Sequence, residues 1–504
     1  MASYSSEKYQ KRVKKIKKLI RNYREEDILD ACINYLYAPA ENEVDRLKRH
    51  PWIVLLVIKW TFIQKSSISY NRYALTNTDF MNILNLTHSL GNVVTMLSKH
   101  ANANIFIKNI AFQQFIYQEP FSMAQYARQY ALFGRLPENS KLSKMFFDEH
   151  GITISDFVSL SFAVITNFTD MEKTFFDRDF FVPLEKTFGM DVIDSFLRTI
   201  STETKHLKKR LTRYNLSKGG YNEFYEQTPF IHTPLIKEKG HYYCVYPHIL
   251  YRCIEHFIYD TLKKKNAKLF MDGFGDIYED YLKIGLNYSE LTYHTEDKIK
   301  KILGKGSKVV DYLVEESANI FIDAKAVEMP YQGKVSDNPE FILGKIKNTA
   351  FKAIEQAYEL NARIIESDNN SEIKYNKTSY LLVVTYKELY VGSGKALYHS
   401  MAKEKMDQLI EKTPSAAVIP PEHIYFITID DFDALMMMAK QNGGGISDVL
   451  STAVAHDKVV EDKKFHFKQH INSILGQPAV PEYLSIETDR ILEDFAVRLG
   501  EDAA

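Results

Sequence analysis

The sequence predicts an all-α N-terminal domain, followed by a mixed α+β or α/β core and a helical C-terminal tail. Apolar residues recur at three- and four-residue steps through residues 1–215, where prolines are few, and this pattern is typical of helices. From about residue 270, short β-rich runs alternate with helical segments. Three glycines at 443–445 then separate the core from the tail.

Length and charge exclude several classes of protein. At roughly 100–200 residues per domain, the 504 residues accommodate two to four domains, each large enough for a hydrophobic core. The net charge of −1 excludes a uniformly basic nucleic-acid coat protein and an acidic disordered tail protein. A local basic groove is compatible with this balance, because a sum over the whole chain hides asymmetry.

Two observations bear on compartment and membrane. Cys32, Cys244 and Cys253 are too few and too scattered for a disulfide framework, so we expect a reducing, cytoplasmic location. The most apolar stretch, residues 52–63, contains Lys59 and is shorter than the ~20 residues that a membrane span requires. We therefore expect a buried helix there and no membrane partner.

The N-terminal helical domain, residues 1–215, carries two basic clusters, and we expect it to be a sensing or regulatory domain. The second cluster, from Lys205 to Arg213, ends the domain. The first helix has one apolar stripe, and its other faces carry Lys8, Lys11, Arg12, Lys14, Lys15, Lys17, Lys18, Arg21 and Arg24. These cations are either a phosphate-binding arm or a solvated helix face.

The rest of the chain divides into a connector at 216–269, a core at 270–442 and a tail at 443–504. The connector contains two short strands around a turn at Gly240 and a helix from about 248 to 265. The elements expected in the core are, in order, a helix at 274–287, strands at 308–314 and 319–327, a helix at 343–366, strands at 380–386 and 423–429, and a helix that opens at Asp430.

The strands at 308–314 and 319–327 form a predicted hairpin with charged residues in apolar surroundings. Asp311 interrupts the first strand, and Asp323 and Lys325 interrupt the second, where side chains two residues apart share a face. Antiparallel pairing across a turn near Glu316 brings Asp311 close to this pair. Burial of two carboxylates and an ammonium without a ligand is costly, and a divalent ion such as Mg²⁺ removes that cost.

A third carboxylate, Glu279, lies off the centre of the apolar stripe of the preceding helix, from which it can face the sheet. Acid-x-Lys triplets are common by chance, and Glu296/Lys298 is an example in a polar stretch, where a solvated ion pair explains it. The Asp323 triplet differs because apolar residues flank it on both sides. The ordered set of helix, strand and strand therefore marks a candidate site.

In this order, Glu279, Asp311 and the Asp323-Ala324-Lys325 triplet resemble the PD-(D/E)XK nuclease superfamily, over roughly residues 270 to 440. The resemblance implies a restriction-endonuclease-like αβββαβ core. It also implies that Asp311 and Asp323 bind Mg²⁺, or Mn²⁺ as a substitute, with Glu279 as a further ligand. Lys325 is then the catalytic lysine. Val310 stands where the superfamily motif has a proline.

Some members of the superfamily carry a glutamine on the helix after the lysine strand. Gln356 is the candidate, and a buried helix-capping or surface glutamine is an equal alternative.

Two other motifs predict no site. Gly392-Ser393-Gly394-Lys395 lacks the first glycine of a phosphate-binding loop, and His466 and His470 lack the glutamate of a zinc-protease helix, so a helix surface is expected for both histidines.

The expected function is that of a Mg²⁺-dependent endonuclease that hydrolyses phosphodiester bonds in DNA or in structured RNA such as tRNA. A helical domain fused to such a core resembles stand-alone bacterial anti-phage defence effectors. That resemblance implies that the helical domain senses a phage protein as the trigger or restrains the nuclease. The alternative is a non-catalytic nucleic-acid-binding or scaffold protein on a degenerate nuclease fold, against which the intact Asp311, Asp323 and Lys325 argue.

Overall fold

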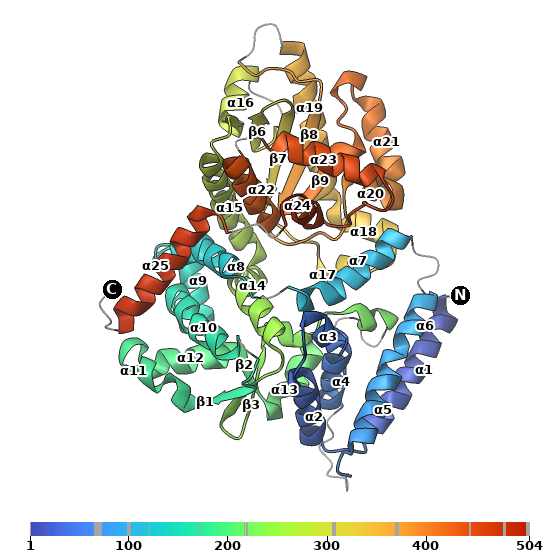
Figure 1. Cartoon of the computed structure of the whole chain (residues 1–504), viewed down its shortest axis with the longest axis vertical. Helices are drawn as coiled ribbons and strands as arrows, with labels where there is room; N and C mark the ends of the chain where they lie inside the picture. The colour runs from blue at the N-terminus through green and yellow to red at the C-terminus, as the bar shows by residue number, and fades with distance from the viewer. Residues whose placement is uncertain are drawn as a thin grey trace. The chain divides into compact units, whose positions relative to one another are not determined.

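A computed structural model divides the chain into two compact units (Figure 1). Unit 1 comprises Met1–His100, Asn109–Ala267 and Asp489–Ala504, and unit 2 comprises Ala101–Lys108 and Lys268–Thr488. The structure describes residues 2–64, 73–97, 102–119, 121–169, 171–215, 217, 220–304, 309–367, 372–442, 445–476 and 480–499.

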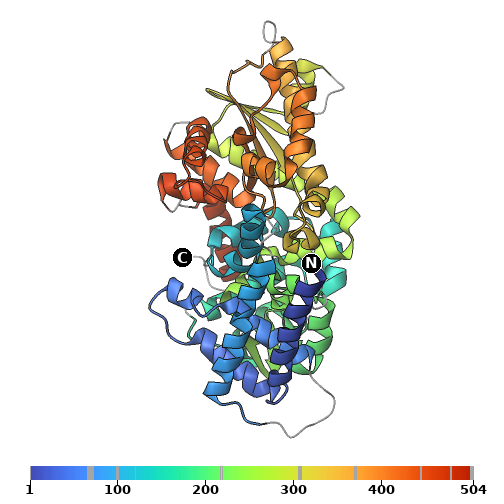
Figure 2. The same ribbon diagram turned by 90° about the vertical axis from the view of Figure 1, so that its right-hand side faces the viewer.

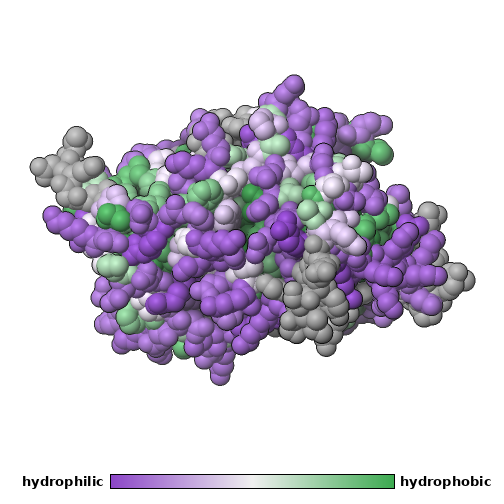
Figure 3. Space-filling model, turned by 90° about the horizontal axis from the view of Figure 1, so that it is seen from below, coloured by the Kyte–Doolittle hydropathy of each residue, from purple (hydrophilic) through white to green (hydrophobic). Residues whose placement is uncertain are grey.

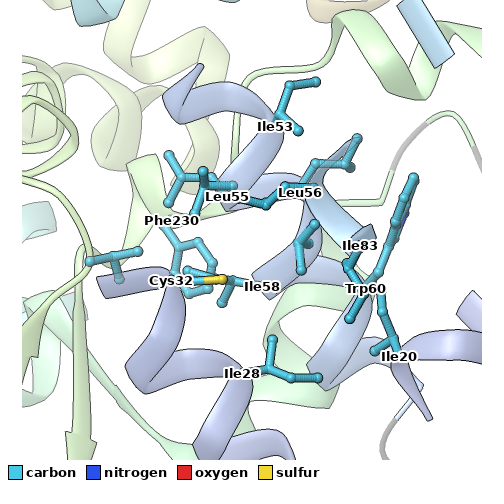
Figure 4. Packing of buried hydrophobic residues seen from close by; sticks show 14 of the residues in the cluster. Ile20, Ile28, Cys32, Ile53, Leu55, Leu56, Ile58, Trp60, Ile83 and Phe230 are labelled. Carbon is cyan, nitrogen blue, oxygen red and sulfur yellow. The ribbon is translucent and has the colours of Figure 1, made fainter. Parts of the chain in front are cut away.

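Unit 1 is mainly helical and packs around α4 (Pro51–Ile63). This helix is apolar on all sides, and a helix of that kind is stable only when neighbours cover it. Figure 4 shows its side chains among those of α1 (Ala2–Ile20), α2 (Glu25–Tyr37) and α5 (Asn77–His88). The other helices of the unit are α3 (Glu43–Leu47), α6 (Leu90–Leu97), α8 (Met123–Gln129), α9 (Lys141–His150), α10 (Ile154–Phe168), α11 (Val182–Phe188), α12 (Met190–Ile200), α13 (Thr204–Arg213) and α14 (Pro247–Lys265).

Unit 1 also contains a four-stranded mixed sheet in the order β1-β4-β3-β2. Its strands are β1 (Phe175–Asp177), β2 (Ser201–Glu203), β3 (Leu235–Glu238) and β4 (His241–Cys244). The all-α prediction for residues 1–215 is therefore wrong at β1 and β2. Each has three residues, too few for an alternating pattern to be visible, and each pairs with a strand that lies far along the chain.

The predicted turn at Gly240 is confirmed. Glu238 pairs with His241, so Lys239 and Gly240 form a two-residue hairpin loop between β3 and β4. Both loop residues have positive φ angles, 50° and 91°, as a twist-compatible hairpin turn of this length requires. The helix expected from about 248 to 265 is α14.

Unit 2 is a mixed α/β unit with a five-stranded sheet in the order β5-β6-β7-β8-β9. The strands are β5 (Tyr293–Thr295), β6 (Tyr312–Glu315), β7 (Asn319–Lys325), β8 (Ser379–Thr385) and β9 (Ile424–Thr428). The helices are α15 (Ala267–Ser289), α16 (Glu296–Leu303), α17 (Tyr331–Val335), α18 (Pro339–Ile346), α19 (Lys352–Ser367), α20 (Gly394–Leu397), α21 (Lys403–Lys412), α22 (Ile429–Asn442), α23 (Ile446–Lys458) and α24 (Phe467–Leu475). The remaining helices, α7 (Ala103–Gln114) and α25 (Glu482–Leu499), contain residues of both units, as does α15 through its first residue, Ala267.

Pairing in this sheet changes from antiparallel to parallel at its central strand. β5, β6 and β7 pair antiparallel, whereas β8 pairs parallel to β7 and β9 parallel to β8. Helices lie on both faces of the sheet (Figure 2). One face, which includes Phe321 and Val383, packs against α18 and α19, and on the opposite face Tyr425 contacts Phe467 of α24. The central strand β7 is therefore buried on both sides.

Most of the predicted core elements lie within a few residues of their predicted positions, but β6 begins at Tyr312, so Asp311 directly precedes this strand and does not interrupt it. Helices α16, α17, α20 and α21 were not predicted. β5 was not predicted as a separate strand, and Lys308, the first residue of the predicted hairpin, lies outside the described residues. The helix predicted at 343–366 is interrupted by a π-helical turn at Lys347–Phe351, which separates α18 from α19. Helix α22 begins before Asp430, because Thr428 and Asp431 exchange hydrogen bonds that cap it.

Hydrophilic residues predominate on the face seen in Figure 3, and hydrophobic ones form small separate patches. The three cysteines are free and buried.

Within the described ranges, no single helix combines the length and hydropathy needed to cross a membrane. Only α9 and α10 taken together, a pair bent by 57°, meet that test.

Candidate active site

The β6–β7 hairpin places Asp311 and Asp323 opposite each other. Tyr312, the first residue of β6, pairs with Ile322, so continuing this register by one residue sets Asp311, which directly precedes β6, opposite Asp323. The Asp311 carboxylate contacts the neighbouring strand β7, where its Oδ2 accepts a 2.5 Å hydrogen bond from the backbone N–H of Ala324. The predicted juxtaposition across the hairpin is thus present in the structure.

Asp323 is the most deeply buried charged group of this cluster. It lies in the central strand, is 1% exposed, and faces the same side of the sheet as Phe321 and Lys325. Lys325 Nζ lies 2.6 Å from Asp323 Oδ2, and the lysine side chain is 18% exposed. Among the described residues, Asp323 Oδ1 has no hydrogen-bond partner. A buried carboxylate oxygen without a donor is costly, so this atom is suited to a ligand that the protein does not supply.

The electrostatics of the cluster favour a cation. Burial raises the pKa of Asp311, and the nearby carboxylates of Asp323 and Glu279 raise it further. Burial also raises the pKa of Asp323, and the Lys325 ammonium opposes this shift without cancelling it. The Lys325 ammonium alone therefore does not balance the negative charge of the nearby carboxylates.

Glu279 influences the pair through its charge. It is half-buried on α15, and its backbone carbonyl accepts a 2.8 Å hydrogen bond from the Tyr312 hydroxyl of β6. Burial raises the pKa of Glu279, as do Glu296 and Asp276, whereas Lys325 lowers it. Among the described residues, no three His, Cys, Asp or Glu side chains form a group that could hold a metal ion. The structure therefore does not join Glu279 to Asp311 and Asp323 in a three-ligand set.

Glu296 is a member of the cluster that sequence reasoning missed. It is the first residue of α16, directly after β5, and its backbone N–H donates a 2.9 Å hydrogen bond to the carbonyl of Asp311. Its carboxylate pairs with Lys300 and raises the pKa of Asp323. The polar sequence around Glu296 predicted a solvated ion pair, because β5 has only three residues and nothing else in the sequence connects Glu296 to the hairpin.

Gln356 contacts the backbone that leads into Asp311. From α19, its Nε2 donates a 2.8 Å hydrogen bond to the carbonyl of Val309, and its buried Oε1 has no partner among the described residues. It is therefore neither a capping nor a surface glutamine. This contact suits a positioning role toward the segment that leads into Asp311.

Two carboxylates fit a Mg²⁺ ion, which is commonly bound by one or two carboxylates and completes its coordination with water and substrate phosphate. The donor-free Oδ1 of Asp323 and the carboxylate of Asp311 across the hairpin are the residues that could hold it. The Ala324 backbone, already tied to Asp311 through its N–H, keeps the two acids in register.

The motifs that predicted no site have structural roles. Ser393 caps α20, and Lys395 reaches the carbonyl of Asp457. His470 is buried and pairs with Asp457 at 3.2 Å, and His466 pairs with Glu388 at 3.0 Å, so the helix-surface prediction for these histidines is wrong.

The candidate site thus consists of the carboxylates of Asp311 and Asp323, the Lys325 ammonium and two nearby acidic residues, Glu279 of α15 and Glu296 of α16. Its character rests on geometry alone. Comparison of the chain with protein-family models, with curated proteins and with solved structures finds no match.

Proposed function

We propose that the protein is a metal-dependent endonuclease that hydrolyses phosphodiester bonds in nucleic acid. The observation that carries the proposal is the buried Asp323, whose Oδ1 has no donor, between Asp311 and Lys325. Two carboxylates for a divalent cation and a lysine beside them are the groups needed to act on a phosphodiester.

Asp311 and Asp323 would hold Mg²⁺, with Mn²⁺ as a substitute, and Glu279 and Glu296 would strengthen its binding through their charge. A bound divalent ion supplies charge stabilisation at the phosphate and lowers the pKa of a coordinated water. Lys325 is held by Asp323 and retains exposure to solvent, so its ammonium can contact a phosphate oxygen as negative charge develops there. Gln356 would keep the segment that precedes Asp311 in place.

The proposed substrate is DNA or a structured RNA such as tRNA. We further propose an anti-phage role, in which a phage protein triggers cleavage and the helical unit senses it. Both rest on the resemblance of the Glu279, Asp311, Asp323 and Lys325 series to the PD-(D/E)XK nucleases. Stand-alone effectors of that kind combine a helical domain with such a core.

The test is to incubate the full chain with plasmid DNA, total RNA and purified tRNA, with and without Mg²⁺, and to compare it with Asp323→Asn. Cleavage that requires Mg²⁺ and is lost in Asp323→Asn supports the proposal. The matched control is Asp457→Asn, which changes another buried aspartate of the same unit and should leave cleavage unchanged. Equal cleavage by wild type and Asp323→Asn would refute the assignment of the site.

A non-catalytic nucleic-acid-binding or scaffold protein is the second candidate. The observation in its favour is that Lys325 already pairs with Asp323 and that no three-ligand metal group is found among the described residues. Calorimetry distinguishes the two functions. The nuclease requires Mg²⁺ or Mn²⁺ binding that Asp311→Asn and Asp323→Asn abolish, whereas the scaffold requires none.

A further inference from the structure

The first helix of unit 1, α1, has strongly separated apolar and basic faces. Tyr9, Val13, Ile16 and Ile20 lie on one side and are each at most 5% exposed. The opposite side carries only one acidic residue, Glu7, and exposes Lys8, Lys11, Arg12, Lys14, Lys15 and Lys18. The basic residues singled out in the sequence therefore do form a surface, and we call these six the basic face of α1.

No carboxylate among the described residues pairs with any of the six side chains of the basic face. Other exposed lysines of the chain behave differently: Lys48 pairs with Asp45 at 2.7 Å, and Lys403 pairs with Asp407 at 2.6 Å. A solvated helix surface ordinarily mixes both signs of charge, because opposite charges three or four residues apart stabilise the helix. Six like charges on one short helix instead repel each other, and a polyanion relieves that repulsion.

The spacing of the basic face suits an extended row of phosphates. Lys8, Lys11, Lys15 and Lys18 follow one line along the helix, because residues three and four apart are neighbours on its surface. At 1.5 Å per residue, this line is about 15 Å long. Duplex nucleic acid carries one charge per roughly 1.7 Å of its axis, so several phosphates fall within that length.

A basic amphipathic helix can also bind an anionic membrane, but it does so by inserting its apolar face. The apolar face of α1 is already committed to the core of unit 1, where Ile20 packs beside Trp60 of α4 (Figure 4). Lys17, which lies at the edge of that face, is held over the Trp60 ring at 5.0 Å. Only the charged face is available, and this favours nucleic acid over a lipid surface.

We propose that the basic face of α1 binds the phosphate backbone of nucleic acid, with no preference for base sequence. The inference does not rest on the proposed nuclease activity, because it concerns unit 1 and predicts binding whether or not cleavage occurs. It explains how a chain with a net charge of −1 can hold a polyanion, since the positive charge is concentrated in one place.

The test compares two full-length variants in the Asp323→Asn background, in which bound nucleic acid is not cut. Lys8→Gln/Lys11→Gln/Lys15→Gln/Lys18→Gln removes the row, and Lys377→Gln/Lys412→Gln/Lys458→Gln/Lys463→Gln removes four exposed lysines of unit 2 with the same change in net charge. Fluorescence anisotropy with labelled tRNA and with a labelled DNA duplex is measured over a range of salt concentrations. Unchanged Trp fluorescence shows that unit 1 remains folded.

We expect the α1 variant to lose affinity by on the order of 100-fold and its salt slope to fall by about 1 per contact removed, with no such change in the control. Equal affinity of the two variants would overturn the proposal. The proposal would also be overturned if the wild-type protein bound phosphatidylserine vesicles through these four lysines and did not bind nucleic acid. If Asp323→Asn and wild type both fail to cleave while α1-dependent binding persists, the nuclease proposal fails and this one stands.

Discussion

Each unit of the protein contains a cluster of two carboxylates and a lysine, but the two clusters differ in burial and in the balance of their charges. In unit 1, Lys59 of α4 reaches Glu223 at 3.1 Å and Glu226 at 2.8 Å, and all three side chains are at most 2% exposed. Trp60 donates a hydrogen bond to Glu223, and the backbone N–H of Ser217 donates one to Glu226. This cluster joins α4 to the segment around Glu223.

The carboxylate pKa shifts have opposite directions in the two clusters. Burial raises the pKa of Glu223, but Lys59, Lys17 and the Trp60 indole outweigh it and hold that pKa below its ordinary value. In unit 2, burial and like charges dominate, so the pKa values of Asp311 and Asp323 are both raised. Two clusters of the same composition therefore differ in their electrostatics. Glu223 Oε2, like Asp323 Oδ1, has no hydrogen-bond partner among the described residues, so the two clusters differ in the balance of charge and not in the count of donors. The cluster whose cations outweigh burial is suited to stabilising the fold, and the cluster with surplus negative charge is the candidate site.

The largest expected effect is on the stability of unit 1. Lys59→Met removes the cation between two buried carboxylates and should lower the free energy of unfolding by about 3–5 kcal/mol. Both tryptophans, Trp52 and Trp60, lie in α4, so their fluorescence during urea unfolding reports on this unit. Lys59→Met/Glu223→Gln/Glu226→Gln should recover most of the loss, since it leaves no uncompensated charge. An unchanged midpoint in the single variant would show that the cluster does not stabilise the fold.

Removing one charge from the unit 2 cluster should leave stability intact and reduce activity. Asp323→Asn relieves repulsion with Asp311, so we expect an unchanged or higher melting temperature by circular dichroism. Cleavage, in contrast, should fall by about 10³-fold, the upper range for loss of one preorganised electrostatic group. A large loss of stability in Asp323→Asn would place this cluster in the same structural class as that of unit 1.

A smaller effect is expected at Gln356. Gln356→Leu leaves the Val309 carbonyl without its side-chain donor and should destabilise unit 2 by about 1 kcal/mol. Because the bond precedes Asp311, kcat should fall several-fold with little change in KM. The conservative variant Gln356→Asn, which is one carbon shorter, should not restore the bond. Normal kcat in both variants would remove Gln356 from the site.

The smallest effect is the acid dependence of unit 1. The folded-state pKa of Glu223 is lowered, so its contribution to stability is complete above the unfolded-state pKa of about 4.3 and is lost as pH falls through the lower folded value. Urea midpoints followed by Trp fluorescence should therefore decline more steeply with acid in wild type than in Glu223→Gln. Parallel declines in the two proteins would show that Glu223 is not held ionised by its neighbours.

Much of unit 2 could be predicted from local patterns. The strands around Asp323 and Val383 are long and apolar, and the acid-x-Lys alternation places two side chains on one face whatever the fold. The short strands β1, β2 and β5 could not be predicted, because three residues carry no period and their partners are distant in sequence. For the same reason Glu296, which enters the cluster through β5, was assigned to solvent.

From the sequence alone it follows that Asp323 and Lys325 share one face of a strand next to the segment of Asp311, that Lys59 lies in a buried helix and that α1 is basic. These follow from residue spacing and hydrophobicity, which are local. Tertiary contacts were needed to show that Lys59 meets two carboxylates, that Asp323 Oδ1 has no donor and that the basic face of α1 has no acidic partners among the described residues. Such pairings join residues up to 167 positions apart, and no local pattern records them.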